Sequence, residues 1–358
     1  MKATQFSIFR LLMAALLVAV LMTGCASQTG VAEVKATDIP QIAMDEPTVT
    51  LSPIPPPATP SPIPPTATPT PIPPTATPLT PTPTELPWIQ FTEFYVPGGD
   101  SWQKLEVYLP REGDGPFPTI LAIHGGGFQA ETRSNYHRYA SYFNGLGYAL
   151  VSIDYRLLPR FRYPAQVQDS FCALAWVHAN ADKYGFDTER IVAIGESAGG
   201  YLVSMLGTVD DPAPYLEGCP YTLPETNWIH GVIPVYGMFD LRTEEGYEPL
   251  VVRNCTEPYL GTKISEASAE FLAEVSPISW VNGNEPPFLI VHGLQDNYIS
   301  SKMADDFAAK LEEAGGNVEL LLLEIGQHGF FTDFPLSSPT NVQTREAITT
   351  FLTALFEK

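Results

Sequence analysis

Hydrophobic positions from residue 88 onward follow two alternating patterns. Short runs rich in β-branched and aromatic residues alternate with longer segments whose apolar positions repeat at helical spacing. Several short runs, such as 119–123, are apolar almost throughout, which is typical of strands buried on both faces. This alternation predicts an α/β fold with a mostly parallel, eight-stranded sheet flanked by helices. The predicted strands are 91–96, 104–108, 119–123, 149–154, 190–194, 231–235, 287–292 and 318–324, and the predicted helices are 135–146, 166–184, 198–208, 300–314 and 342–356.

The first 24 residues have the pattern of an export signal. Lys2 and Arg10 precede an apolar run, 11–22, whose twelve residues are too few to span the roughly 30 Å hydrocarbon core of a membrane. The run ends in Leu-Met-Thr-Gly followed by Cys25, which resembles the lipobox of bacterial lipoproteins. The resemblance implies a lipoprotein signal peptide over 1–24 and a lipidated Cys25 that anchors the exported protein to the outer face of a bacterial membrane. The alternative is a secretory signal with an incidental cysteine.

A proline-rich segment separates this signal from the rest of the chain. Of 36 prolines, 17 lie in the 41 residues 47–87, where a nine-residue repeat of the form Pro-Ile-Pro-Pro-x-Ala-Thr-Pro occurs three times. Such a composition cannot form a packed core and favours extended polyproline II. We therefore predict a disordered tether over 25–87 and one catalytic domain over 88–358, whose 271 residues suit a single α/β domain. The repeats could alternatively carry O-glycans or bind aromatic-lined grooves.

Charge and composition narrow the classes of partner. Acidic residues outnumber basic ones by 40 to 19, the formal net charge is -21, and no run of Lys or Arg occurs in the globular part. Nucleic acids and other polyanions are therefore not expected as partners. We attribute the acidic excess to the solubility of an exported protein rather than to steering of cationic substrates. The sequence has no metal-ligand cluster and no phosphate-binding glycine loop followed by Lys, so we expect no cofactor and no metal.

A candidate nucleophile follows the fifth predicted strand. The sequence Gly195-Glu-Ser197-Ala-Gly-Gly lies between strand 190–194 and a helical pattern, and it has the form Gly-x-Ser-x-Gly. So tight a turn from strand to helix forces a strained backbone at the serine, and small neighbours let the strand and the helix approach each other. The hydroxyl is then exposed at the end of the sheet. We therefore predict Ser197 as the nucleophile.

The acid and the base follow the nucleophile along the chain in this arrangement. Of six histidines, only His328 lies beyond the plausible acids, directly after the last predicted strand. Asp296, in the loop after the seventh predicted strand, is our first choice of acid, and Asp240, after the sixth, is the alternative. His328 would take the proton of Ser197, and Asp296 would fix the tautomer of the imidazole and stabilise the imidazolium.

A glycine-rich loop is placed to stabilise the oxyanion of the reaction. The sequence His124-Gly-Gly-Gly-Phe follows the third predicted strand, where glycines bring backbone N–H groups close to the substrate. We expect the N–H groups of Gly126, Gly127 and Ala198 to form the oxyanion hole. A flexible turn is the alternative interpretation. His124 and His292, both at strand ends, are expected to hydrogen-bond their own loops.

Together these residues resemble the α/β-hydrolase superfamily, and within it the hormone-sensitive-lipase-like carboxylesterases, over about residues 102–358. The segments Asp154-Tyr-Arg156-Leu and Tyr-Pro-Ala-Gln-Val-Gln-Asp169 are most similar to the bacterial feruloyl and acetyl xylan esterase-like group. That resemblance implies esters of plant-wall polysaccharides as substrates. The alternative is structural, with Asp154 and Arg156 forming an ion pair under the sheet. We expect no helical cap before the first strand, which favours an open site over a long-chain lipase pocket.

Two insertions, 209–228 and 240–285, are expected to cover the site, and each holds one cysteine. We expect a disulfide bond between Cys219 and Cys255, since export permits disulfides. Cys172, on a predicted helix, is expected to be a small buried apolar residue. The aromatic residues that could line the acyl pocket, or equally pack in the core, are Phe128, Tyr201, Phe330 and Phe331.

The function expected from these residues is hydrolysis of short-chain or aromatic acyl esters by a Ser-His-Asp triad through an acyl-enzyme. A serine peptidase or amidase of the prolyl oligopeptidase type is one alternative. Those enzymes usually carry an aromatic residue where this chain has Ala198, and a large N-terminal propeller where it has the tether. A non-catalytic binding protein with a hydrolase fold is the other alternative. Such proteins typically lose the serine or the histidine, whereas this chain keeps both Ser197 and His328.

Overall fold

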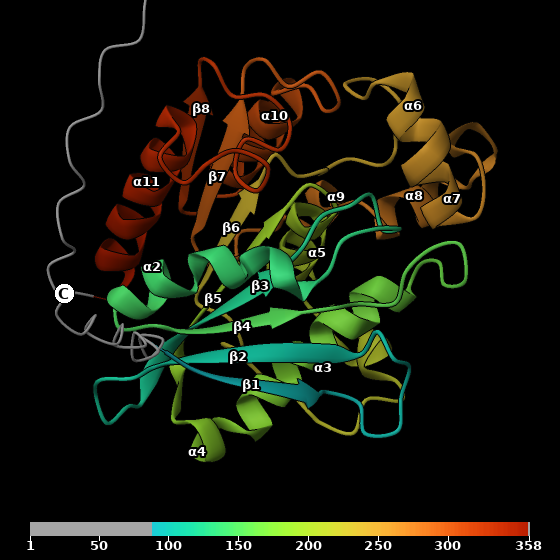
Figure 1. Ribbon diagram of the computed structural model, residues 1–358. Coiled ribbons are helices and arrows are strands. Elements are labelled where there is room, and N and C mark those ends of the chain that lie inside the picture. The colour runs from blue at the N-terminus through green and yellow to red at the C-terminus, as the bar shows by residue number, and fades with distance from the viewer. Residues whose placement is uncertain (1–87, 357–358) are drawn as a thin grey trace, which may run out of the picture. The chain divides into compact units, whose positions relative to one another are not determined.

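The computed structural model describes residues 88–356, so the predicted signal peptide and the whole predicted tether, including Cys25, lie outside the described residues. An eight-stranded sheet runs through the described part in the order β1-β2-β4-β3-β5-β6-β7-β8 (Figure 1). β2 pairs antiparallel with both β1 and β4, and all the other neighbouring strands are parallel, which confirms the predicted mostly parallel sheet. The strands are β1 (Trp88–Phe94), β2 (Lys104–Pro110), β3 (Phe117–Ile123), β4 (Ala149–Ile153), β5 (Phe186–Glu196), β6 (Gly231–Val235), β7 (Phe288–Gly293) and β8 (Val318–Leu323).

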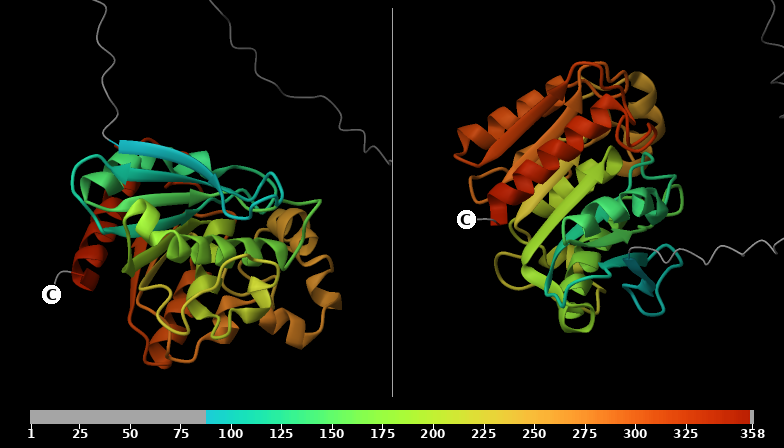
Figure 2. Two further views of the ribbon diagram at one scale, coloured as in Figure 1. Left: turned by 90° about the horizontal axis from the view of Figure 1, so that it is seen from below. Right: turned by 60° about the vertical axis from the view of Figure 1, so that its left-hand side comes forward.

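Helices cover both faces of the sheet and enclose two hydrophobic cores. One core holds apolar side chains of α3, α5 and α10, and the other holds those of η1, α2 and α11. Figure 2 shows these layers from two further directions. The helices and helical turns are η1 (Arg133–Tyr139), α2 (Ala140–Gly145), α3 (Ala165–Ala179), α4 (Ala181–Tyr184), α5 (Ala198–Thr208), η2 (Ala213–Leu216), α6 (Pro249–Val251), η3 (Val252–Thr256), α7 (Glu257–Leu260), η4 (Ile264–Glu266), α8 (Ala269–Glu274), α9 (Pro277–Trp280), α10 (Lys302–Glu313) and α11 (Pro339–Phe356).

The central strands are apolar because helices cover both of their faces. Every residue of β4, β6 and β7 is buried, as are the last five residues of β3. Because β3, β5, β6, β7 and β8 run parallel, their carboxyl ends meet at one edge of the sheet. The loops that follow these strands therefore come together there.

Two predicted helices are shorter than expected. The predicted helix 135–146 is a 3₁₀ turn, η1, followed by the short α2. A 3₁₀ turn aligns residues three apart, so Tyr136 and Tyr139 both face the core. The predicted helix 166–184 divides at Asn180, whose side-chain amide donates to the carbonyl oxygen of Trp176, the type of local contact that competes with a continuing helix.

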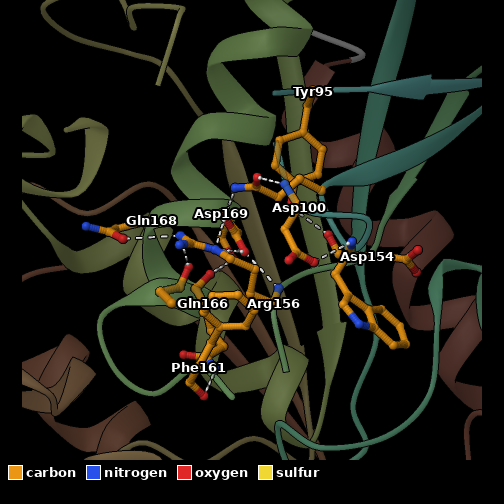
Figure 3. A network of polar contacts seen from close by, with 12 residues as sticks. Tyr95, Asp100, Asp154, Arg156, Phe161, Gln166, Gln168 and Asp169 are labelled. Atoms are coloured by element: carbon orange, nitrogen blue, oxygen red, sulfur yellow. Dashed lines mark hydrogen bonds and ion pairs between the residues drawn. The ribbon is translucent and has the colours of Figure 1, made fainter. Parts of the chain in front are cut away.

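Arg156 does not pair with Asp154, so the alternative ion pair under the sheet is wrong. The guanidinium of Arg156 contacts Asp169 at 2.9 Å and Gln168 at 3.2 Å, both on α3, whereas the Asp154 carboxylate pairs with Arg133. Figure 3 shows the carboxylate of Asp154 pointing away from Arg156. Arg156 therefore fixes the chain after β4 to α3, and the Asp154–Arg133 pair fixes the segment after the glycine loop.

The expected disulfide between Cys219 and Cys255 is also wrong. Cys219 is bonded to Cys172 on α3, with Cα atoms 5.6 Å apart, and Cys172 is therefore not a free apolar residue. Packing explains this pairing. Tyr215 of the first insertion stacks on Phe171 of α3, and this contact brings Cys219 close to Cys172, which follows Phe171 in sequence. Cys255 is the free cysteine of the described residues.

The second insertion, 240–285, folds into short helical turns. Figure 1 shows α6, α7 and α8 beyond the carboxyl ends of the central strands, at the upper right of the sheet. One of the turns, η3, is a π-helix, a form that is frequent at functional sites. Within residues 88–356, no helix is both long and apolar enough to cross a membrane.

Candidate active site

Ser197 occupies the turn between β5 and α5. Its backbone has φ 54° and ψ -117°, a conformation that residues other than glycine rarely adopt. Its N–H donates to the carbonyl oxygen of Val235 at 2.9 Å, which fixes the turn against β6. Gly199 lies so close to β3 that an added Cβ would be 2.0 Å from the carbonyl oxygen of Ile123. The turn therefore requires glycine at position 199, and it leaves the Ser197 side chain at the edge of the sheet.

Ser197, His328 and Asp296 form a hydrogen-bonded row. Nε2 of His328 is 3.0 Å from Oγ of Ser197, and its Nδ1 is 2.7 Å from Oδ2 of Asp296. The three residues follow β5, β8 and β7, so three strand ends supply them. The structure thus places Asp296, and not Asp240, beside the histidine. The Asp240 carboxylate instead pairs with the guanidinium of Arg242 at 2.7 Å.

The carboxylate of Asp296 is buried among hydrogen-bond donors. Its Oδ1 accepts from the N–H groups of Tyr298 at 2.8 Å and Ile299 at 2.9 Å, and Nε2 of His292 lies 3.4 Å from its Oδ2. Burial alone would raise the pKa of Asp296, but the hydrogen bonds from His292 and His328 outweigh burial and lower that pKa below its ordinary value. Asp296 therefore stays ionised and is able to stabilise a protonated His328.

The glycine loop after β3 borders the same pocket as the Ser197 hydroxyl. Gly126 and Gly127 have φ angles of 82° and 60°, in the left-handed region that favours glycine. Among the residues that the structure describes, the N–H groups of these two glycines have no hydrogen-bond acceptor. Ala198 begins α5, where the first N–H groups of a helix are unpaired and carry partial positive charge. All three expected oxyanion donors are thus next to the serine.

Glu196 is a residue of this site that sequence reasoning missed. Its side chain is 1% exposed and accepts hydrogen bonds from the N–H of Gly125 at 3.0 Å and the hydroxyl of Tyr136 at 2.5 Å. Burial raises the pKa of Glu196 to about 8. Glu196 thus connects the Ser197 turn to the start of the glycine loop. A signal was present in the sequence, because a polar residue inside this tight turn is buried and needs polar partners.

A pocket of about 220 Å³ opens beside Ser197. Phe128, Tyr201, Phe330 and Phe331, the aromatic residues considered for the acyl pocket, do not line it, because they are buried in the core. The side chains that form its less polar wall are Tyr236, Met238, Val251, Cys255, Tyr298 and Ile299.

Only one of the two insertions reaches this pocket. The second insertion contributes Val251 and Cys255. Residues of the first insertion, 209–228, instead line two hollows of about 600 and 650 Å³ near the amino ends of β5 and β6, away from Ser197. The expectation that both insertions cover the site is therefore wrong for 209–228, which the Cys172–Cys219 bond holds against α3.

The mouth of the pocket is acidic. Glu131 and Asp333 line it, and no Lys or Arg from the described part of the chain does. Partial burial, together with the charge of Asp333, raises the pKa of Glu131. A substrate that carries a negative charge close to its reactive bond would be repelled at this mouth.

His124 and His292 hydrogen-bond their own loops, as predicted. Nδ1 of His124 is 3.1 Å from the carbonyl oxygen of Gly125, and its ring stacks on Tyr155 with centroids 4.3 Å apart. Burial lowers the pKa of His124 to about 3, so its ring is neutral. Nε2 of His292 is 2.9 Å from the carbonyl oxygen of Ile299. Over residues 88–356, no group of three or more His, Cys, Asp or Glu side chains could hold a metal ion.

Comparison with known proteins shows the family of this chain. The BD-FAE family model matches residues 105–311, which is more than half of the chain and includes Ser197 and Asp296. The curated esterase LipC of Mycobacterium tuberculosis is 31% identical over 239 residues, which are 65% of this chain and 58% of LipC. The chain thus spans somewhat more than half the length of the curated relatives that it matches.

Solved structures agree with the fold. The thermophilic esterase Est2 of Thermogutta terrifontis is 26% identical, with a TM-score of 0.63 over 74% of this chain and 92% of Est2. A truncated carbohydrate esterase from gut microbiota, 23% identical, has a TM-score of 0.60 over 77% of this chain and 99% of its own. The chain therefore belongs to the BD-FAE family and has the α/β-hydrolase fold that its sequence predicts.

Proposed function

We propose that this protein is a carboxylic ester hydrolase in which Ser197 is the nucleophile. The observation that carries this proposal is the row in which His328 lies 3.0 Å from the Ser197 hydroxyl and 2.7 Å from the ionised Asp296. A base within hydrogen-bond reach of a nucleophile, oriented by a third group, is what acyl transfer requires. The names of LipC and Est2, both esterases, give independent support.

The proposed reaction has two steps. As Oγ of Ser197 attacks the carbonyl carbon of the ester, Nε2 of His328 accepts its proton, and the N–H groups of Gly126, Gly127 and Ala198 stabilise the resulting oxyanion. Collapse of this intermediate breaks the bond to the alcohol oxygen, which leaves with the proton from His328. Water then attacks the acyl-enzyme by the same route, gives its proton to the histidine and releases the acid and the serine.

Glu196 assists this reaction by remaining neutral. Its pKa of about 8 keeps the carboxyl group mostly protonated near neutral pH. An ionised Glu196 would place a negative charge beside the loop that must stabilise the oxyanion. Burial, which raises the pKa, therefore removes a charge that would oppose catalysis.

The proposed acyl group is short-chain or aromatic, and uncharged. A pocket of about 220 Å³ is small for a long acyl chain, and its acidic mouth disfavours anions. Est2 has been solved with propionate bound and with butyrate bound. We further propose a hydroxyl of a plant-wall polysaccharide as the alcohol, on the resemblance of the segments from Asp154 to Asp169 to feruloyl and acetyl xylan esterases.

The proposed location is the outer face of a bacterial membrane. The apolar run 11–22, followed by Thr-Gly and Cys25, supports lipidation of Cys25, and the proline-rich segment after it would hold the enzyme away from the lipid surface. An enzyme so placed could reach esters on a polymer that cannot enter the cell.

The ester assay tests the central proposal. We expect the full-length protein to hydrolyse p-nitrophenyl acetate, butyrate and ferulate, with kcat/KM for decanoate at least about tenfold below that for butyrate, because the pocket is small. Ser197→Ala should lower kcat by about 1,000-fold or more.

A pair of aspartate variants tests the choice of acid, with Asp240→Asn as the control for Asp296→Asn. Asp296→Asn should lower kcat by about 10,000-fold, because it disturbs the histidine tautomer, whereas Asp240→Asn should leave kcat close to wild type. Full activity in Ser197→Ala, or no hydrolysis of any ester by the wild type, would refute the proposal.

The raised pKa of Glu196 predicts a pH-dependent contribution to stability. The folded-state pKa of about 8 lies above the ordinary value of 4.5, so this contribution is complete below about pH 4.5 and is lost as pH rises through about 8. Urea unfolding of wild type and Glu196→Gln between about pH 5 and 9 isolates the effect. The free energy of unfolding of the wild type should fall relative to the variant over this range, and a constant difference would show that Glu196 does not titrate as described.

Membrane fractionation tests the proposed anchor. Wild-type protein expressed in a bacterium with lipoprotein processing should sediment with membranes, whereas Cys25→Ser should move most of it to the soluble fraction. If the variant stays in the pellet as firmly as the wild type, Cys25 is not the anchor.

A further inference from the structure

The glycine loop contains backbone strain that its own sequence does not relieve. Phe128 has φ 65° and Glu131 has φ 71°, although neither is glycine. Residues with side chains adopt this region only when their surroundings fix them there. Inside the loop, the N–H groups of Gln129 and Ala130 both donate to the carbonyl oxygen of Gly126 at 3.1 Å. Contacts from outside hold the loop as well, and they come from different elements for its first and second halves.

The sheet and its connections hold the first half of the loop. The N–H of Gly125 donates to the Glu196 side chain, and the carbonyl oxygen of Gly125 accepts from the Tyr155 hydroxyl at 2.6 Å. The carbonyl oxygen of Phe128 accepts from the N–H of Leu158 at 2.8 Å. These contacts fix the backbone on the side of the sheet, but none of them reaches the ring of Phe128.

The second insertion holds the other half. The ring of Phe128 is stacked on Tyr259 of α7, with centroids 3.9 Å apart and planes 11° apart. Nε2 of Gln129 donates to the carbonyl oxygen of Asn254 at 3.0 Å. A Cβ at Gly127 would lie 2.7 Å from Sγ of Cys255, so the insertion and the loop are in close contact.

Tyr259 is itself firmly placed. Its side chain is fully buried, its carbonyl oxygen accepts from the N–H of Tyr163 at 3.0 Å, and its hydroxyl donates to that of Tyr201 at 3.2 Å. Tyr201 lies on α5, the helix that begins with Ala198 directly after the nucleophile. Tyr259 therefore contacts both elements that supply the expected oxyanion donors, the glycine loop and the first turn of α5, which also meet directly where the Phe128 and Tyr201 rings pack edge to face at 5.6 Å.

We propose that Tyr259 is a positioning residue for the oxyanion hole. By stacking on Phe128 it fixes the strained half of the loop, and with it the direction of the Gly126 and Gly127 N–H groups. The inference rests on the proposed ester hydrolysis and deepens it, because it gives the insertion a role in the rate of the chemical step. A mere cover over the pocket would instead affect how substrate binds.

These two roles differ in what they change. Donors that are slightly displaced lose their strength mainly in the transition state, where the oxyanion exists, so kcat falls while KM changes little. A cover that shapes the pocket changes KM and the preference among acyl groups. A transition-state mimic also distinguishes the two roles. Ser197 adds to the carbonyl of a trifluoromethyl ketone and creates an oxyanion, whereas bound butyrate forms no adduct with the serine and no such oxyanion.

The experiment compares three variants of the full-length protein with wild type. Tyr259→Leu removes the stacked ring, Tyr259→Phe keeps it and loses only the hydroxyl, and Phe271→Leu removes an aromatic ring of the same insertion that contacts Tyr163 but not the loop. For p-nitrophenyl acetate we expect Tyr259→Leu to lower kcat by about 10- to 100-fold with KM within about twofold of wild type. A short-chain trifluoromethyl ketone should bind more weakly by a similar factor, and butyrate should bind as before.

Tyr259→Phe and Phe271→Leu should both remain within about threefold of wild type in kcat. Equal kcat for Tyr259→Leu and wild type, or a change in KM and butyrate affinity without a change in kcat, would overturn the proposal. Circular dichroism tests folding, and if Tyr259→Leu does not fold, Tyr259→Met, whose longer and more flexible side chain adapts to the space left by the ring, is judged by the same criteria. If the wild type cleaves no ester, the proposed function fails. If the wild type is active and Tyr259→Leu is equally active, only the role of Tyr259 fails.

Discussion

The left-handed backbone of Ser197 is the constraint on which the rest of the site depends. At this one residue β5 ends and the chain turns into α5. The conformation is held because the N–H of Ser197 donates to the carbonyl oxygen of Val235 and because Gly199, which has no side chain, packs against β3. The same turn places the serine hydroxyl within reach of His328 and puts the N–H of Ala198 at the start of a helix. The loops after β3, β7 and β8 bring the glycine loop, Asp296 and His328 to the same place.

Two buried carboxyl groups of the site, those of Asp296 and Glu196, differ in charge because their surroundings differ. Asp296 receives two backbone N–H groups and two imidazoles, which keep it ionised in spite of burial. Within the described part of the chain, Glu196 has fewer donors and no cationic partner, so burial prevails and raises its pKa. In the proposed reaction, the site thus has one negative charge where the imidazolium would form and none where the oxyanion would form, and the surroundings of the two groups produce this difference.

The sheet and the hydrogen-bonded row follow from local sequence patterns, which explains why they could be predicted. Apolar runs mark the strands, and the order of Ser197, Asp296 and His328 along the chain follows from the order of strand ends. The cysteine pairing and the pocket wall could not be predicted in this way. They depend on how the insertions pack, and the contacts that decide it, such as Tyr215 on Phe171 and Tyr259 on Phe128, join residues far apart in sequence with no local signal. The position of Glu196 in the tight turn indicates burial, but its partners Gly125 and Tyr136 are far from it in sequence, and so its role was missed.

Covalent labelling of Ser197 is the most direct test of the claim that this serine is an activated nucleophile. Est2 has been solved phosphorylated by paraoxon. In this protein Oγ of Ser197 should displace p-nitrophenolate from paraoxon and retain one diethylphosphoryl group, which intact mass spectrometry and peptide mapping would locate. We expect one adduct per chain, on Ser197, forming at least about 100-fold more slowly in Asp296→Asn. No adduct, or an adduct on another residue, would contradict the role assigned to Ser197.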